Sequence, residues 1–308
     1  MLPPGFALGH WHDEQACTGC SVVLAPEKTV GSCDVRGSSP GSRELALLSP
    51  LRKMQEVHAL VLTGGSAFGL AAADGVMRFL EETGRGYQTP WGRVPIVPAA
   101  VVFDLNCGSA SVRPTAESGY RAARAAQSDA DAEGSVGAGM GATVGKWAGI
   151  EHRMRGGLGI SSAVTGDLVV TAVAVVNAVG DVLGDDGTPL AGAREPSGAW
   201  ASARDPLRRL VLDRGPEVQN TTLVAVLTNA RLTKLETHRV AQRGHDGMAR
   251  AIRPVHTAYD GDIVFALSSG QVAAEVELLA ELGAELTARA IRRAVLAARP
   301  VHGIAAAR

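Results

Sequence analysis

A run of five apolar residues, Leu223–Leu227, begins directly after Asn220-Thr221-Thr222, late in the chain. The preceding segment is polar and broken by Gly and Pro, so a buried strand is predicted to start abruptly at a hydroxyl residue. Such a junction suits a precursor that cuts its own backbone before Thr221, because the new terminus would carry a nucleophilic hydroxyl and a basic amine on one residue. Asn and Thr are also ordinary turn and strand-edge residues, so the alternative is a loop that simply ends at Asn220.

The chain has 308 residues, which is enough for one large domain or two ordinary ones. Its hydrophobic fraction of 46% and charged fraction of 20% are typical of a globular protein with a large core. The formal net charge of −1 gives no sequence-wide attraction to nucleic acid or to anionic lipid. We therefore expect no nucleic-acid partner and no membrane partner, since the chain also lacks an apolar run long enough to span a bilayer.

The chain contains four cysteines: Cys17, Cys20, Cys33 and Cys107. These are too few for a disulfide framework, and no charged and then apolar leader is evident at the N-terminus, so we expect a reduced, cytoplasmic setting. His10 and His12 precede the Cys17-x-x-Cys20 pair, but this spacing is unlike the common zinc patterns. We expect small buried cysteines and no metal.

The first half of the chain alternates strands and helices. Residues 57–63 form an apolar strand, and Ser66 then caps a helix whose apolar positions repeat at three and four residues up to Leu80. Residues 94–103 are apolar but interrupted by two prolines, which predicts extended backbone. A helix of small residues is expected over 116–126.

The second half continues with elements that share a clear apolar period or a strong strand composition. They are a strand at 168–176, a strand turning back after Gly180, the strand from Thr221, a helix at 235–252, a strand at 262–267 and a helix at 272–298. Residues 185–220 lack a sustained period and are expected to form a long surface segment of the functional or mobile kind. No internal repeat or linker divides the chain, so one domain is predicted over residues 1–308.

Asp260-Gly261-Asp262 lies immediately before the apolar residues that begin the 262–267 strand. Alternate residues of a strand point to the same side, so the two carboxylates are placed to converge on one site. The alternative is a tight turn, in which Asp and Gly have their usual conformational roles.

Lys146 and Asn177 are two further candidates. Lys146 ends a glycine-dense stretch, where a lysine can stabilise charge in a pocket, or can be an ordinary exposed residue. Asn177 ends the apolar strand at 168–176, where its amide can donate to an oxyanion or can belong to a turn. His58 and His256 flank strands and have no partner evident from the sequence.

The glycine-rich segments do not match nucleotide or nucleophile-elbow motifs. Gly137-Ala138-Gly139-Met140-Gly141 lacks the spacing of the dinucleotide fingerprint, and no Walker sequence is present. Gly64-Gly65-Ser66-Ala67-Phe68-Gly69 has Phe68 where the last glycine of a nucleophile elbow should stand.

Several segments together resemble the P1 family of self-processing aminopeptidases, the DmpA-like enzymes of peptidase family S58. The matching segments are Val57–Leu70, Asp34-Val35-Arg36-Gly37, Pro95-Ile96-Val97-Pro98, Val136–Met140, Gly156-Gly157-Leu158-Gly159, Asn220-Thr221-Thr222 and Asp260-Gly261-Asp262. The resemblance covers nearly the whole chain and is weakest over residues 185–220. The family includes L-aminopeptidase/D-esterases, β-peptidyl aminopeptidases and the nylon-oligomer (6-aminohexanoate) endohydrolase.

The resemblance implies an α/β fold of the αββα sandwich type shared by DmpA and the ornithine acetyltransferases. It implies self-cleavage between Asn220 and Thr221 into an α chain of residues 1–220 and a β chain of residues 221–308. Thr221 is then the nucleophile, and the site is lined by Lys146, Asn177, Asp260 and Asp262. The resemblance further implies a homotetramer of processed units that hydrolyses peptides or oligoamides through an acyl-enzyme and needs no cofactor.

The Thr nucleophile, the Lys and the Asp-Gly-Asp triplet are more similar to the nylon-oligomer endohydrolase branch. The aminopeptidase branch more usually has a Ser nucleophile and a Ser-Gly-acid triplet, and its oxyanion tyrosine has no clear counterpart here, where the nearest position is a glycine. The alternative activity is an acyltransferase of the ornithine acetyltransferase type. A further alternative is an uncleaved binding protein on the same scaffold.

Overall fold

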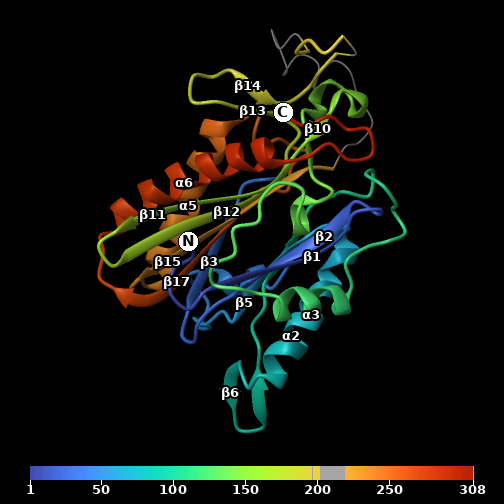
Figure 1. Cartoon of the computed structure of the whole chain (residues 1–308). Coiled ribbons are helices and arrows are strands. Elements are labelled where there is room, and N and C mark those ends of the chain that lie inside the picture. The colour runs from blue at the N-terminus through green and yellow to red at the C-terminus, as the bar shows by residue number, and fades with distance from the viewer. Residues whose placement is uncertain (196, 202–218, 308) are drawn as a thin grey trace.

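A computed structural model describes residues 1–195, 197–201 and 219–307 of the chain. Two five-stranded sheets lie face to face, and each is covered on its outer side by a pair of helices, which gives four layers in the order α, β, β, α (Figure 1). Much of the expected 185–220 surface segment lies outside the described residues. Among the described residues no helix is long and apolar enough to cross a membrane.

The first sheet has the strand order β1-β2-β5-β8-β4. Its strands are β1 (Ala7–Asp13), β2 (Thr18–Leu24), β5 (Ala59–Thr63), β8 (Ala99–Val101) and β4 (Ser42–Arg43). Only β5 and β8 pair in parallel, and the other neighbours are antiparallel. Helices α2 (Ala72–Glu82) and α3 (Ala116–Arg124) bury their apolar faces against this sheet.

The second sheet has the strand order β11-β12-β15-β17-β3. Its strands are β11 (Gly157–Thr165), β12 (Leu168–Asn177), β15 (Thr221–Ala230), β17 (Ile263–Val272) and β3 (Val30–Val35). Strand β15 is central, pairing antiparallel with β12 and parallel with β17. Helices α5 (Lys234–Ala251) and α6 (Val276–Ala297) cover the outer face.

Both faces of the second sheet are buried, which explains why its central strands are continuously apolar. On β15, Leu223 and Leu227 pack between the two sheets, whereas Val224 and Val226 pack against the helices. This is the alternation that a pleated strand imposes.

Helix α5 begins at a capping box that the sequence carries at Thr233 and Glu236. The Glu236 N–H donates to Thr233 Oγ1 at 3.3 Å, and the Glu236 carboxylate accepts from the Thr233 N–H at 2.7 Å. Two backbone donors at the start of the helix are thereby satisfied, so the helix begins here.

Shorter elements connect the layers. They are α1 (Leu45–Leu48), β6 (Tyr87–Thr89), β7 (Gly92–Val94), β9 (Thr143–Val144), β10 (Met154–Arg155), β13 (Asp181–Leu183), β14 (Pro189–Ala191), β16 (Ile252–Arg253) and the 3₁₀ turns Ser66–Ala71, Gly137–Gly139, Lys146–Ala148 and Ile150–His152. The β6–β7 hairpin projects from the end of α2 (Figure 1).

The expectation that Ser66 caps a helix is wrong. Ser66 has a left-handed backbone, with φ of 52°, and belongs to a 3₁₀ turn without a side-chain cap. The buried Asp104 accepts the Gly65 N–H at 2.7 Å and holds the chain in this turn, so the α-helix begins only at Ala72.

Candidate active site

Thr221 and Asn177 lie directly opposite each other on adjacent strands. Asn177 ends β12, Thr221 begins β15, and the register pairs the two residues. Strand alternation places both on the face that is turned toward the other sheet, together with Val175 and Leu223. Thr221 is 4% exposed and Asn177 is fully buried, so the predicted nucleophile lies inside the uncut chain.

The peptide bond between Asn220 and Thr221 is held by contacts from the Asp-Gly-Asp segment. The Thr221 hydroxyl donates to the Asn220 carbonyl, and the Gly261 N–H donates to the same oxygen at 2.9 Å. The Asn220 N–H donates to the Tyr259 carbonyl at 3.0 Å. The hydroxyl therefore lies against the carbonyl of the bond that self-cleavage would break, and a backbone N–H already polarises that carbonyl.

Asp262 holds the backbone just beyond the predicted nucleophile. Its Oδ1 accepts the Thr222 N–H at 2.7 Å. Its Oδ2 accepts the His256 N–H at 3.1 Å and lies 2.8 Å from His256 Nδ1. Sequence reasoning found no partner for His256, because a histidine six residues before an aspartate carries no motif.

Asp260 contacts other groups than Asp262 does. Its Oδ1 accepts the Val179 N–H at 3.2 Å, and its Oδ2 accepts from the N–H and the hydroxyl of Thr257 at 3.2 and 2.5 Å. Burial, followed by the charge of Asp262, raises the pKa of Asp260 to about 6. The two carboxylates are thus electrostatic neighbours at the start of β15, but they orient different backbone segments.

Lys146 and Asn177 form a second polar group in the site. Lys146 Nζ donates to the Asn177 carbonyl at 3.1 Å and to Asn177 Oδ1 at 2.9 Å. Asn177 Oδ1 also accepts the Thr143 N–H at 2.9 Å, and Nδ2 donates to the Phe103 carbonyl at 3.0 Å, so this network assigns the amide orientation. Among the described residues this amide nitrogen has one acceptor, so its second N–H is left for a further one.

Lys146 is 3% exposed, so the alternative of an ordinary surface lysine is wrong. Burial lowers the pKa of Lys146 to about 7, against an opposing effect of the Asp260 charge. Near neutral pH this amine can therefore hold or release a proton. Asn177 is the last residue of a ten-residue strand, and its side chain is buried. The alternative of a turn asparagine therefore does not apply.

The Asp34-Val35-Arg36-Gly37 motif supports the carboxylate segment from the end of β3. The Arg36 and Gly37 N–H groups donate to the Asp262 carbonyl at 3.1 and 3.2 Å. A Cβ on Gly37 would lie 2.1 Å from the Asp262 nitrogen, so only glycine allows this approach. The motif thus has a mechanical role in placing Asp262.

His10, His12, Cys17 and Cys20 do not assemble a metal site, and no cluster of three or more His, Cys, Asp or Glu side chains suited to a metal occurs among the residues described. His10 Nδ1 lies 2.8 Å from Ser21 Oγ, and Cys20 is buried in β2. The expected buried cysteines are confirmed at all four positions.

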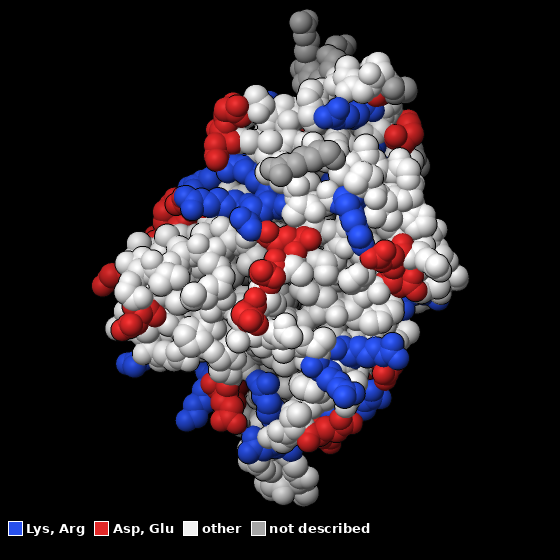
Figure 2. Space-filling view, viewed as in Figure 1, with Lys and Arg blue, Asp and Glu red and all other residues white. Residues whose placement is uncertain are grey.

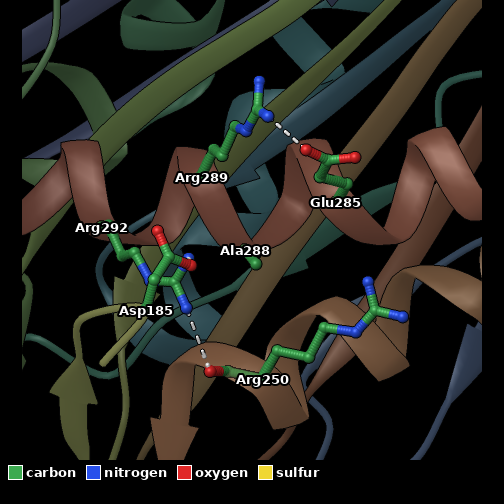
Figure 3. A pocket seen from close by; sticks show the side chains of 6 residues that line it. All are labelled: Asp185, Arg250, Glu285, Ala288, Arg289 and Arg292. Carbon is green, nitrogen blue, oxygen red and sulfur yellow. Dashed lines mark hydrogen bonds and ion pairs between the residues drawn. The ribbon is translucent and has the colours of Figure 1, made fainter. Parts of the chain in front are cut away.

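A cavity of about 520 Å³ lies on the outer helix layer and shares no lining residue with the Thr221 group (Figure 3). It is lined by Asp185, Arg250, Glu285, Ala288, Arg289 and Arg292. Its arginines are paired with acidic side chains at Asp185, Glu281 and Glu285. Figure 2 shows a group of adjoining basic side chains at the upper left, bordered by acidic ones, and smaller groups of both signs elsewhere on the face in view.

The model of peptidase family S58 matches residues 4–308. A Mycobacterium leprae protein described as an uncharacterised aminopeptidase is 43% identical over 97% of this chain and 90% of its own length. The chain belongs to peptidase family S58. The 6-aminohexanoate-oligomer endohydrolase of Agromyces sp. is 31% identical over 87% of this chain and 74% of its own length.

Two solved structures share the fold of this family S58 chain. The L-aminopeptidase D-Ala-esterase/amidase of Ochrobactrum anthropi, described as a variant of the Ntn hydrolase fold, has a TM-score of 0.71 at 16% identity and covers 96% of this chain and 85% of its own. A β-aminopeptidase from Burkholderia sp. has a TM-score of 0.70 at 21% identity and covers 98% and 87%. The expected αββα sandwich is confirmed.

Membership of family S58 makes the protein a hydrolase of peptide or amide bonds. Its relatives include proteins described as aminopeptidases and as oligomer endohydrolases, and the identity is higher with the mycobacterial relatives than with the endohydrolases. The acyltransferase alternative is not favoured by these matches.

Proposed function

We propose that the chain cuts itself between Asn220 and Thr221 and that the new N-terminal Thr221 hydrolyses short peptides or oligoamides. The observation that carries the proposal is the placement of the Thr221 hydroxyl against the Asn220 carbonyl, which also accepts the Gly261 N–H. This carbonyl is both within reach of a nucleophile and supplied with an oxyanion donor.

In the first stage Thr221 Oγ1 attacks the Asn220 carbonyl carbon and loses its proton. The Gly261 N–H stabilises the oxyanion, the C–N bond breaks, and the Thr221 nitrogen takes up a proton to become an amine. Water then hydrolyses the ester, which leaves a carboxylate on Asn220 and restores the Thr221 hydroxyl. Lys146, with a pKa lowered by burial to about 7, is a candidate to accept and return the proton.

In the second stage the free α-amino group of Thr221 accepts the hydroxyl proton during attack on a substrate amide, since such amines titrate at roughly 7.7–8.0 in model peptides. The remaining N–H of Asn177, supported by Lys146, donates to the tetrahedral oxyanion. Asp262, through the Thr222 N–H, and Asp260, through the Val179 N–H, hold the terminus in place. The C–N bond of the substrate then breaks, and the protonated α-amino group gives its proton to the leaving amine. Water hydrolyses the acyl-enzyme to a free acid and restores the Thr221 hydroxyl.

Burial of the site in the uncut chain supports the order of the two stages. Thr221, Asp260 and Asp262 are each 4% exposed or less. Cleavage makes Asn220 a chain end, so it can move away and admit a substrate to the hydroxyl that it covered. Hydrolysis of external amides is therefore expected only after processing.

The test compares Thr221→Ala with Thr221→Ser and Thr222→Ala by intact mass after long incubation. Thr221→Ala should remain one chain without amide hydrolysis, whereas Thr221→Ser should split at the same bond because it keeps a hydroxyl. Thr222→Ala is the matched control, since Thr222 contributes its N–H to Asp262 and this N–H survives the change. A Thr221→Ala protein that still splits would refute the assignment, and an unsplit wild-type chain would favour the uncleaved binding protein.

The substrate proposal is supported by the family relatives, which are described as aminopeptidases and as a 6-aminohexanoate-oligomer endohydrolase. We propose short peptides, β-peptides and ω-amino acid oligomers as substrates. A panel with free and with acetylated amino ends separates cleavage next to the amino end from internal cleavage. Hydrolysis of none of these by fully processed protein would refute this substrate class.

We further propose a cytoplasmic homotetramer of processed units. Four unpaired cysteines fit a reducing compartment. Large apolar side chains at Leu51, Trp91, Leu235 and Leu278 are at least half exposed and are available for contacts between copies. Mass photometry and cell fractionation test the two statements, and a monomer at working concentration would contradict the first.

A further inference from the structure

A buried arginine lies between two cysteines beside the candidate site. Arg155, on the short strand β10, is fully buried. Its Nη1 lies 3.5 Å from Cys17 Sγ and 3.4 Å from Cys107 Sγ, and its Nη2 donates to the Met140 carbonyl. Cys17 comes from the turn between β1 and β2, and Cys107 from the loop after β8, so long-range folding brings the three side chains together.

This guanidinium has no carboxylate partner within ion-pair distance among the residues that the structure describes. Asp104 lies near enough to interact electrostatically with Arg155. Its carboxylate instead accepts hydrogen bonds from the Thr18 hydroxyl and the Gly65 N–H, each at 2.7 Å. An arginine is always charged, and a buried charge without compensation is costly, so an anion in contact with Arg155 would be stabilised there.

Cys107 can supply that anion. The thiol of Cys17, followed by the guanidinium of Arg155, lowers the pKa of Cys107 in spite of burial, while the pKa of Cys17 is raised. Cys20 and Cys33 lie in β2 and β3, and burial raises the pKa of each to about 12. Of the four thiols, Cys107 is therefore the one whose pKa is lowered.

We propose that Cys17 and Cys107 form a peroxide-sensitive thiol pair, in which the Cys107 thiolate is the counter-ion of Arg155 and oxidation joins the two sulfurs. The oxidant is hydrogen peroxide, an uncharged molecule of nearly the size of water. No assigned role of the family S58 site uses these two residues.

The chemistry balances with one peroxide per pair. The Cys107 thiolate attacks one oxygen, the O–O bond breaks, and the sulfur becomes a sulfenic acid while hydroxide leaves and is protonated by the medium. Cys17 then loses its proton and attacks the sulfenic sulfur, the S–O bond breaks, and the oxygen leaves as water. Two thiols are oxidised to a disulfide, and the peroxide is reduced to two waters.

Oxidation is coupled to the candidate site by charge and by chain connection. The negative charge of Cys107 is one of the groups that raise the pKa of Lys146, so its removal lowers that pKa further. Phe103, four residues before Cys107, accepts the Asn177 amide through its carbonyl. We therefore expect oxidation to change the pH profile of amide hydrolysis; this consequence alone rests on the proposed function.

The primary test maps disulfides and does not depend on activity. The full-length chain, as purified, is treated with increasing hydrogen peroxide, quenched, denatured in N-ethylmaleimide and digested for mass spectrometry. Cys17 and Cys107 should be lost together as a cross-linked peptide pair, roughly ten-fold or more ahead of Cys20 and Cys33, because all four cysteines are buried and thiolate content then decides the rate. Cys17 and Cys20 share the tryptic peptide ending at Lys28, so the Cys20→Ser variant assigns the cross-link.

Matched variants separate the proposal from general oxidation. Cys107→Ser should leave Cys17 as slow to react as Cys20, whereas Cys33→Ser should leave the cross-link unchanged. Cys17→Ser should stop Cys107 at the sulfenic acid, which dimedone captures. Equal oxidation of all four cysteines, or alkylation of Cys17 and Cys107 after peroxide has consumed Cys20, would overturn the proposal. A cross-link without any change of the pH profile would overturn only its coupling to the active site.

Discussion

Gly261 is the residue at which the size of a side chain matters most in this site. Its N–H donates to the Asn220 carbonyl at 2.9 Å, and a Cβ there would lie 2.8 Å from Thr221 Oγ1 and 2.6 Å from the Ser39 carbonyl. The glycine between the two aspartates is therefore required for contact with the Asn220-Thr221 peptide, and it is more than a turn residue.

We expect Gly261→Ala to slow self-cleavage by about 100-fold or more, because loss of one well-placed oxyanion donor has that order of effect. The measurement is the appearance of the residue 221–308 chain over time by intact mass. Gly283→Ala is the control, because a Cβ at Gly283 meets its nearest atoms at an ordinary 3.5 Å. Unchanged processing in Gly261→Ala would show that this N–H does not support the reaction.

Lys146 gives a prediction about stability and pH. Burial lowers the pKa of Lys146 from 10.5 to about 7 in the folded chain, so between these values the unfolded state binds more protons. The contribution of Lys146 to stability is therefore lowest below pH 7 and rises as pH increases from about 7 to about 10.5, by at most ~1.4 kcal/mol per pH unit.

Lys146→Met removes this pH-dependent contribution to stability and keeps the length of the side chain. The free energy of unfolding in urea, measured in a Thr221→Ala background at several pH values, should rise with pH in the protein that keeps Lys146 relative to the Lys146→Met variant. Lys53→Met, at an exposed position, should show no such difference. If the difference between the proteins with and without Lys146 is flat across this range, the amine keeps its proton when buried.

At the scale of elements, helix α6 fixes the outer face of the sheet that carries Thr221. Leu286 is 1% exposed in the core between α6 and this sheet, whereas Leu278 on the same helix is 50% exposed. Both are leucines of one predicted helix, so only the structure distinguishes the two positions.

We expect Leu286→Ala to lower the free energy of unfolding by about 2–4 kcal/mol through lost burial and a cavity. Leu278→Ala should change it by less than about 0.5 kcal/mol. Both variants are unfolded in urea in the Thr221→Ala background, so that the chain stays uncut and unfolds in one transition. Equal effects of the two changes would contradict the packing of α6 described above.

At the scale of the whole molecule, the proposed cut falls inside an interleaved sheet. Strands β15 and β17 would belong to the C-terminal product, but β15 pairs with β12 and β17 pairs with β3, which belong to the N-terminal product. Each product would expose unpaired central strand edges if it left the other.

We therefore expect the two products to remain together after cleavage. On a native sizing column residues 1–220 and 221–308 should elute in one peak, and they should separate only in denaturant. The residue 221–308 chain expressed alone should not fold, which circular dichroism and proteolysis can check. Free exchange of the two products under native conditions would contradict this arrangement.

The strands and helices with a strong apolar period along the sequence were predicted correctly. The strands at 168–176 and from Thr221 and the helix at 235–252 correspond to β12, β15 and α5 within a few residues. Strand β11 was missed because Gly157 and Gly159 have low strand propensity. Only packing explains these glycines, since a Cβ at Gly159 would lie 2.0 Å from the Ala290 carbonyl of α6.

The sequence by itself determined the periodic elements and the side chains that have the chemistry for amide hydrolysis. The tertiary structure alone decided that Lys146 is buried against Asn177, that His256 holds Asp262 and that Gly261 contacts the Asn220 carbonyl. The physical reason is the distance along the sequence over which each property is set. Strand and helix periods depend on neighbours in sequence, whereas burial, pKa and hydrogen-bond partners depend on residues that only folding brings together.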